Sequence, residues 1–177
     1  MVDVNKKKLR DLFEKSYKDF SDAIFRYCYF HTSNREKALD LSHDTFVKTW
    51  EYLSSEKGKE IDNIRAFLYR VARNLIIDDR RKKKSSSLDN LLENGFEITG
   101  EESEFIIKEN EFEAKEALKA VQGLEEKYKD VILMRYVEDM SVKDIAKILD
   151  DNENTVSVRI HRGIEKLKSI LGENEKQ

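Results

Sequence analysis

The chain has 177 residues, of which 39% are hydrophobic and 39% charged, and its formal net charge is −3. This length allows one or two small domains, and six glycines with no proline favour helices over sheets. One cysteine excludes an internal disulfide framework, and no apolar run reaches membrane-spanning length, so we expect a cytoplasmic protein with no membrane insertion.

Charge is unevenly distributed along the chain. Residues 1–84 carry 20 Lys and Arg against 14 Asp and Glu, residues 85–112 carry 1 against 8, and residues 113–177 carry 12 against 14. A basic first part, an acidic middle and a near-neutral end suggest a different partner for each part. The low overall charge therefore does not argue against nucleic-acid binding.

Three amphipathic helices are predicted in residues 1–84. The first spans about residues 6–30, the second starts at Ser33 with Glu36 completing a capping box, and the third spans about residues 63–83. Their expected buried stripes are Leu9, Leu12, Phe13, Tyr17, Phe20, Ile24 and Tyr27; Ala38, Leu41, Thr45, Phe46, Thr49, Trp50 and Leu53; and Ile64, Phe67, Leu68, Val71, Leu75 and Ile76. Short connections between such helices predict a small helical domain.

Residues 85–112 are predicted to form a flexible acidic linker. The segment opens with three serines at 85–87, contains two glycines, and includes an acidic cluster at 101–104. Its charge suggests either a solvated tether or a segment that lies in a basic channel of a partner.

A helix-turn-helix is predicted in the second domain, residues 113–172. Ser141 and Asp144 form a capping box that opens a short helix, and residues 150–153 break it. A second helix then carries apolar residues on one face, Val156, Ile160, Ile164, Leu167 and Leu171, and polar residues on the other, Thr155, Arg159, Arg162 and Lys166. Such a second helix can enter the major groove of duplex DNA. The chain is therefore expected to be all-α, with two small helical domains.

Three stretches of this sequence resemble one family in order and spacing. They are residues 38–50 (ALDLSHDTFVKTW), residues 64–78 (IRAFLYRVARNLIID), and residues 124–162 with the helix-turn-helix. The chain resembles a bacterial RNA polymerase sigma factor of the extracytoplasmic-function (ECF) group, which keeps only the regions called two and four. The resemblance implies that residues 1–84 are region two and residues 113–172 are region four.

The resemblance implies three sets of contacts. The core polymerase would be bound by Asp40, His43, Asp44, Val47 and Lys48, although Asp44 and Lys48 could instead pair with each other. The minus-ten promoter element would be opened and held by Arg65, Tyr69, Arg70, Arg73, Asn74, Arg80, Arg81 and Lys82, unless these only form a solvated basic helix end. The minus-thirty-five element would be read by Thr155, Ser157, Arg159, His161, Arg162 and Lys166.

Several positions depart from the family pattern. His43 stands where Gln is usual, and the Pro that usually precedes the position of Glu125 is missing. The turn carries Asp150 and Asp151 where Gly and an apolar residue are usual. Asp tolerates the left-handed conformation expected at position 150, whereas Asp151 is expected to loosen the turn. Val158 stands where Ser is common, so one base contact of the family is expected to differ.

Two other functions remain open at this point. A stand-alone regulator would use only the helix-turn-helix, usually as a dimer on palindromic half-sites. A nuclease would need clustered acidic metal ligands, and Asp78-Asp79 is the only adjacent pair of carboxylates in residues 1–84.

We expect no enzyme activity, no cofactor and no metal, since Cys28, His31 and His43 do not follow a zinc-binding spacing. The expected partners are core RNA polymerase and promoter DNA, both duplex and single-stranded. An anti-sigma factor is implied by the resemblance alone.

Overall fold

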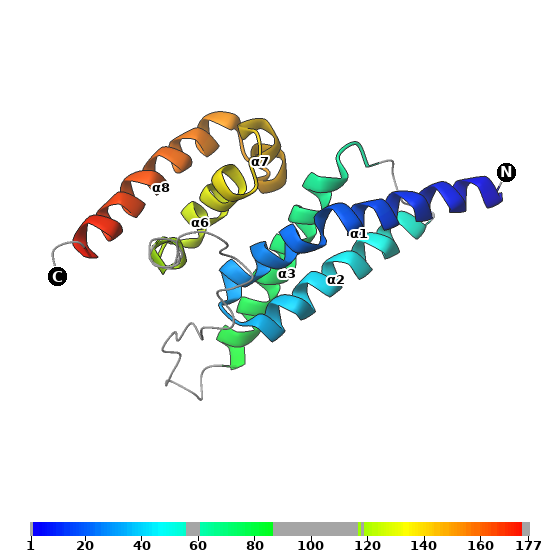
Figure 1. The fold of residues 1–177 in the computed structure, drawn as a ribbon, viewed down its shortest axis with the longest axis horizontal. Helices are drawn as coiled ribbons and strands as arrows, with labels where there is room; N and C mark the ends of the chain where they lie inside the picture. The colour runs from blue at the N-terminus through cyan, green and yellow to red at the C-terminus, as the bar shows by residue number, and fades with distance from the viewer. Residues whose placement is uncertain (1, 56–60, 87–116, 118, 175–177) are drawn as a thin grey trace. The chain divides into compact units, whose positions relative to one another are not determined.

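The computed structural model describes residues 2–55, 61–86, 117 and 119–174, which fold into helices and turns with no strand among them. They belong to two compact units, one within residues 1–94 and one within residues 95–177 (Figure 1). Most of the expected linker, including the acidic cluster at 101–104, lies outside the described residues. No helix in the described ranges has the length and apolarity needed to span a bilayer. The expected all-α class is confirmed.

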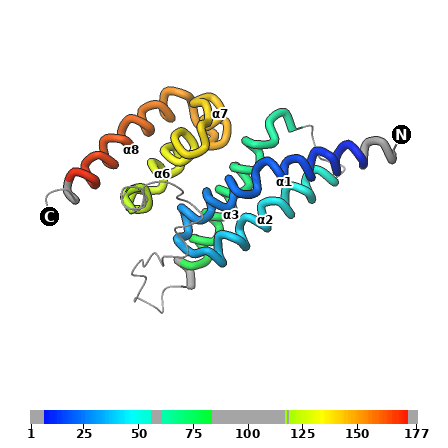
Figure 2. The backbone as a smooth tube through the Cα atoms, in the orientation of Figure 1, coloured from blue at the N-terminus to red at the C-terminus, as the bar shows by residue number. Residues whose placement is uncertain are grey.

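The first unit is built from three helices, α1 (Val2–Thr32), α2 (Arg35–Ser54) and α3 (Ile64–Ser86). α1 and α2 lie side by side in opposite directions, and α3 packs against both (Figures 1 and 2). Fully buried side chains from all three helices, including Ile24, Thr45 and Leu68, form the core. α3 continues to Ser86, past the expected end near residue 83.

The N-terminal cap of α2 differs from the predicted one. Ser33 adopts a left-handed conformation with a φ of 52°. Asn34 caps the helix instead, because its Oδ1 accepts a hydrogen bond of 2.8 Å from the backbone N–H of Lys37. The predicted capping box from Ser33 to Glu36 is therefore wrong by one residue. α3 begins in the same way, with Asn63 Oδ1 accepting from the N–H of Ala66 at 3.0 Å.

The predicted buried stripes are correct only in part. Ile24 and Tyr27 of α1 are buried as expected, whereas Tyr17 is 48% exposed and Trp50 of α2 is 38% exposed. The reason is visible in Figure 1, where the N-terminal part of α1 extends beyond α3 and only α2 accompanies it. Thr45 and Thr49 are buried without penalty, since each hydroxyl donates to the backbone carbonyl four residues earlier.

The second unit contains α6 (Glu126–Ile132), the π-helical turn η1 (Leu133–Val137), α7 (Val142–Leu149) and α8 (Glu153–Asn174). In the π-helical turn the N–H of Glu138 donates to the carbonyl of Leu133, five residues earlier, at 3.0 Å. The turn is followed by a short loop, which Arg135 fixes by donating to the carbonyl of Met140 at 2.8 Å.

α6 and α8 approach each other closely at Gly163. A Cβ at this position would lie 2.9 Å from Cγ1 of Ile132, which is tighter than ordinary van der Waals contact. The absence of a side chain therefore sets the distance between the two helices.

The helix-turn-helix has the predicted local structure. Ser141 Oγ accepts from the N–H of Asp144 at 3.1 Å, and Asp150 takes the left-handed conformation with a φ of 56°. Both predictions are confirmed. Asn152 then caps α8, since its Oδ1 accepts from the N–H of Thr155 at 2.8 Å.

Candidate nucleic-acid and polymerase interfaces

The six residues predicted to read duplex DNA occupy two faces of α8. Thr155, Arg159, Arg162 and Lys166 follow steps of four, three and four, which places them along one side of the helix. Ser157 and His161 lie four residues apart on another side, and both are exposed. In this second pair, Nδ1 of His161 lies 3.6 Å from Oε2 of Glu165.

A hollow of about 370 Å³ lies between α8 and the start of α6. Its lining comprises Lys127, Tyr128, Asn154, Thr155, Val158, Arg159 and Arg162. Three cationic side chains, those of Lys127, Arg159 and Arg162, therefore line one hollow, which Thr155 of α8 also borders. Lys127, Tyr128 and Asn154 were missed from the sequence, because only the folded contact between the two helices brings them here.

Glu125 connects two lysines at this edge of the second unit. Its two carboxylate oxygens each lie 2.9 Å from an ammonium group, Oε1 from Lys166 and Oε2 from Lys127. The hydrogen bond from Lys166, followed by that from Lys127, lowers the pKa of the Glu125 carboxyl. The same contact with Glu125 raises the pKa of Lys127. Lys166, predicted to bind DNA, therefore also has a contact inside the unit.

Asp151 has a defined partner in the structure. Its Oδ2 accepts from Nη1 of Arg159 at 2.6 Å, and its backbone N–H donates to the carbonyl of Ala146 at 3.0 Å. The expectation that Asp151 loosens the turn is therefore wrong, since its side chain ties the turn to α8.

The residues predicted to handle the minus-ten element also divide between surfaces. Arg70, Asn74 and Arg81 are exposed and follow steps of four and seven along α3, so they share one face, which we term the outer face of α3. Arg81 lies 3.9 Å from Asp78, a long contact for an exposed ion pair. Arg65 and Arg73 are half-buried, and Lys82 lies in a groove shared with α2.

Two of the predicted minus-ten residues serve the interior of the first unit. Tyr69 is 0% exposed, and its ring centroid lies 5.2 Å from that of Tyr27. The prediction that Tyr69 contacts DNA is corrected, since a fully buried ring offers no surface to a base. Arg80 Nη2 donates to the backbone carbonyl of His31 at 2.7 Å, near the C-terminal end of α1, where helix carbonyls lack intrahelical partners.

The residues predicted to bind polymerase lie along α2 and border two hollows. Asp40, Asp44 and Lys48 face a groove of about 640 Å³ between α2 and α3, which also contains Lys82 and Asp79. Asp79 is already paired with Lys37 and Lys83. Among the described residues, no ion pair joins Asp44 and Lys48.

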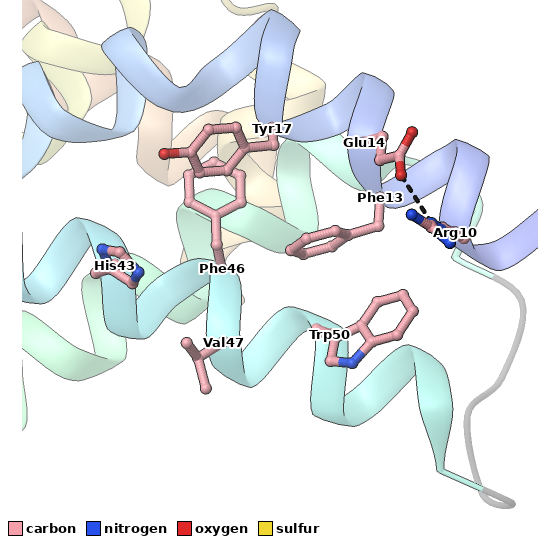
Figure 3. A pocket seen from close by; sticks show the side chains of 8 residues that line it. All are labelled: Arg10, Phe13, Glu14, Tyr17, His43, Phe46, Val47 and Trp50. Atoms are coloured by element: carbon pink, nitrogen blue, oxygen red, sulfur yellow. Dashed lines mark hydrogen bonds and ion pairs between the residues drawn. The ribbon is translucent and has the colours of Figure 1, made fainter.

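The second hollow is an aromatic groove of about 590 Å³ between α1 and α2 (Figure 3). Phe13 and Tyr17 project from α1 toward Phe46 and Trp50 of α2. The ring centroids of Phe13 and Trp50 lie 5.1 Å apart, and those of Tyr17 and Phe46 lie 4.8 Å apart. The other lining residues are Arg10, Glu14, His43 and Val47. The sequence assigned the four aromatic residues to the core. Phe46 is buried as predicted, whereas Phe13 is half-buried and Tyr17 and Trp50 are exposed, so the groove is an accessible apolar surface.

No group of three or more His, Cys, Asp or Glu side chains is placed to hold a metal ion in the residues that the structure describes. Cys28 is buried in the first unit, and burial raises the pKa of its thiol to about 12. A thiol in that environment is neutral at physiological pH.

Comparison with known proteins gives consistent matches along the chain. Residues 17–86 match the family described as Sigma-70 region 2, and residues 114–167 match the family described as Sigma-70, region 4. The chain is 31% identical to the ECF RNA polymerase sigma factor SigW of Bacillus subtilis, over 94% of this chain and 92% of that protein. It is 24% identical to the RNA polymerase sigma factor SigV of the same organism, over 86% and 87%.

Two solved structures have a similar fold. One is the sigma factor RpoE in complex with the anti-sigma factor NepR from Bartonella quintana, with a TM-score of 0.76 and 21% identity over 90% of this chain and 96% of that one. The other is CnrH in complex with the cytosolic domain of CnrY, with a TM-score of 0.64 and 20% identity over 92% and 89%.

Proposed function

Because the chain belongs to the ECF group of RNA polymerase sigma factors, which direct promoter-specific initiation of transcription, we propose how its two units share that task. Residues 1–84 bind core polymerase and open the minus-ten element, and residues 113–172 read the duplex minus-thirty-five element. The stand-alone regulator is set aside, since the similarity includes region 2 at residues 17–86 as well as the helix-turn-helix.

The outer face of α3 is the observation that carries the proposed melting step. Arg70 and Arg81 supply cations for phosphates, and Asn74 between them supplies an amide that can bond to an unpaired base. Unstacking a base costs a few kcal/mol. The aromatic residues of α3, Phe67 and Tyr69, are respectively half-buried and buried. Hydrogen bonds and phosphate contacts, together with polymerase, therefore have to offset this cost.

Permanganate footprinting of promoter complexes tests this role. With holoenzyme containing Asn74→Ala, we expect thymine reactivity at the minus-ten element to fall by a few-fold to about tenfold, since one hydrogen bond contributes about 0.5–1.5 kcal/mol. Arg70→Ala should act in the same direction. Arg35→Ala is the matched control, because Arg35 is exposed in the same unit but lies at the start of α2. Equal melting by all three variants would contradict the proposal.

The α2 surface is proposed to bind core polymerase through two adjoining features. The carboxylates of Asp40 and Asp44 can pair with arginines of a partner, and the aromatic groove beside them can receive apolar side chains. His43 borders both hollows, so the two features form one continuous surface.

Affinity measurements with core polymerase separate this surface from the rest of α2. Val47→Asp places a charge on the rim of the groove, and Asp44→Asn removes one carboxylate. Both should weaken binding about tenfold or more, whereas the control Glu51→Gln, another exposed acid of α2, should not. If all three variants bind core polymerase equally, a different surface is used.

An anti-sigma partner is the last part of the proposal. One of the two solved structures of similar fold is a sigma factor in complex with an anti-sigma factor, and the other is CnrH in complex with the cytosolic domain of CnrY. We extend this to a protein inhibitor that covers the same α2 surface. Such an inhibitor must compete with core polymerase, so a ternary complex isolated by size-exclusion chromatography would contradict the extension.

A further inference from the structure

The ion pair between Asp151 and Arg159 joins the turn of the helix-turn-helix to the DNA-facing helix. Arg159 lies about two turns into α8, and Asp151 lies just before that helix begins. Their side chains are 30% and 25% exposed, so the pair is less screened by water than most surface ion pairs. The backbone of Asp151 is itself fixed, since its N–H donates to Ala146 and the preceding Asp150 is left-handed. A carboxylate on a hydrogen-bonded turn thus pairs with the end of a long side chain.

The pair also affects the charge of the hollow beside α8. Arg159 lines that hollow with Lys127 and Arg162, so three cations share a small space. Asp151 offsets the charge of Arg159 and draws the Arg159 guanidinium toward the turn. Only one guanidinium nitrogen, Nη1, is seen bonded to Asp151, and an arginine has five N–H donors. This bond therefore orients the whole guanidinium group, including the N–H donors of Arg159 that Asp151 does not use.

We propose that Asp151 is a positioning residue for reading DNA. It holds Arg159 in one orientation, so the base preference of the second unit depends on Asp151 although Asp151 does not itself contact a base. This inference rests on the proposed function of α8 at the minus-thirty-five element. An arginine that is held loses less conformational freedom when it binds, and it cannot turn to the alternative bases and phosphates that a free arginine reaches.

Promoter selection by the holoenzyme tests the inference. Core polymerase with the wild-type chain, with Asp151→Ala or with Glu153→Ala selects templates randomised across the minus-thirty-five element, at two salt concentrations. Glu153→Ala is the matched control, because it removes the same charge from an exposed residue two positions away. We expect both variants to bind duplex DNA more tightly, since each removes a negative charge near phosphates.

Only Asp151→Ala should also relax the preference at one base position, by about fivefold or more, which is the lower end of what one arginine–guanine pair discriminates. Arg159→Lys, which keeps the charge but lacks the planar fork, should relax the preference at the same position. A merely structural role for Asp151 would lower stability without changing preference at a single base. Asp151→Asn, which keeps the shape of the side chain, provides the same comparison if the alanine variant fails to fold.

The possible results separate the inference from the function on which it rests. If the wild-type holoenzyme selects a motif, and Asp151→Ala selects the same motif with the same base preferences as Glu153→Ala, the inference is overturned while the proposed function of α8 stands. If the wild-type holoenzyme selects no motif, the proposed function of α8 fails and the DNA role of the pair fails with it. A double-mutant cycle of Asp151 and Arg159 in urea unfolding then measures whether the two side chains are coupled in the free protein.

Discussion

Replacing Gly163 with alanine tests how closely α6 and α8 pack. The new Cβ would lie 2.9 Å from Cγ1 and 3.1 Å from Cδ1 of Ile132, and 3.5 Å from Cβ of Tyr128. Ile132 is 3% exposed and Tyr128 is 7% exposed, so neither side chain can move into solvent. Alanine in a helix interior gains about 1 kcal/mol over glycine, but an added methyl group in a packed core costs about 1–3 kcal/mol. The free energy of unfolding of the second unit should therefore fall by about 0–2 kcal/mol.

Gly172→Ala is the matched control in the same helix. Apart from its chain neighbours and the backbone of its own helix, no atom of the described residues lies within 4 Å of a Cβ at that position, and the residue is exposed. The control should keep part of the helix-propensity gain without the steric cost. The difference between the two variants then isolates the packing cost, which we expect to be about 1–3 kcal/mol.

Urea unfolding followed by two signals provides the assay. Trp50 is the only tryptophan of the chain and lies in the first unit, so its fluorescence follows that unit. Far-UV circular dichroism follows both units, and a transition without a fluorescence change belongs to the second. If Gly163→Ala is as stable as Gly172→Ala or more stable, the close contact at Gly163 does not constrain the unit and the reasoning is refuted.

Three other side chains allow simple measurements. Burial raises the pKa of Cys28 to about 12, so the native chain at pH 8 should resist iodoacetamide and the chain in urea should react; rapid native alkylation would contradict this. Hydrogen bonds from Lys166 and Lys127 lower the pKa of Glu125, so its contribution to stability is present above the ordinary carboxyl pKa and is lost as the pH falls through the lowered value. An NMR titration of Glu125 should show this lowered midpoint, and Glu125→Gln should remove its part of the acid-side loss of stability. Ser141→Ala removes the N-cap of α7 and should cost about 1 kcal/mol in urea unfolding.

Local features of the fold could be predicted because they depend on neighbours in sequence. Ser141 and Asp144 were identifiable as a cap from their spacing, and the left-handed conformation of Asp150 was expected because the family that the chain resembles usually has Gly at this position. The same reasoning failed by one residue at Ser33 and Asn34, where two adjacent residues can both cap a helix. The geometry of the turn before α2 decided between them, and the sequence pattern does not contain it.

Long-range features of the site could not be predicted from periodicity. Tyr17 and Trp50 belong to the same apolar stripes as fully buried residues. They are exposed because α3 does not extend along the N-terminal part of α1, so it does not cover them. Tyr69 sits among arginines in sequence and nevertheless packs inward against Tyr27. The pairing of Asp151 with Arg159 needs the turn and the following helix in place. These contacts exist only in the folded unit, where segments distant in sequence meet, so a periodic pattern does not reveal them.

The π-helical turn at Leu133–Val137 has a consequence for how such domains diverge. A π turn accommodates one residue more than an α-helical turn, as the bond from Glu138 to Leu133 shows. Deleting one residue there would let α6 end in an ordinary α-helical turn, and the chain after it would keep nearly its present direction, because the wider turn already absorbs the additional residue. Only the contacts made from within the turn, such as the bond from Arg135 to the Met140 carbonyl, would have to form again. A single codon can therefore be gained or lost at this position while α7 and α8 keep their arrangement.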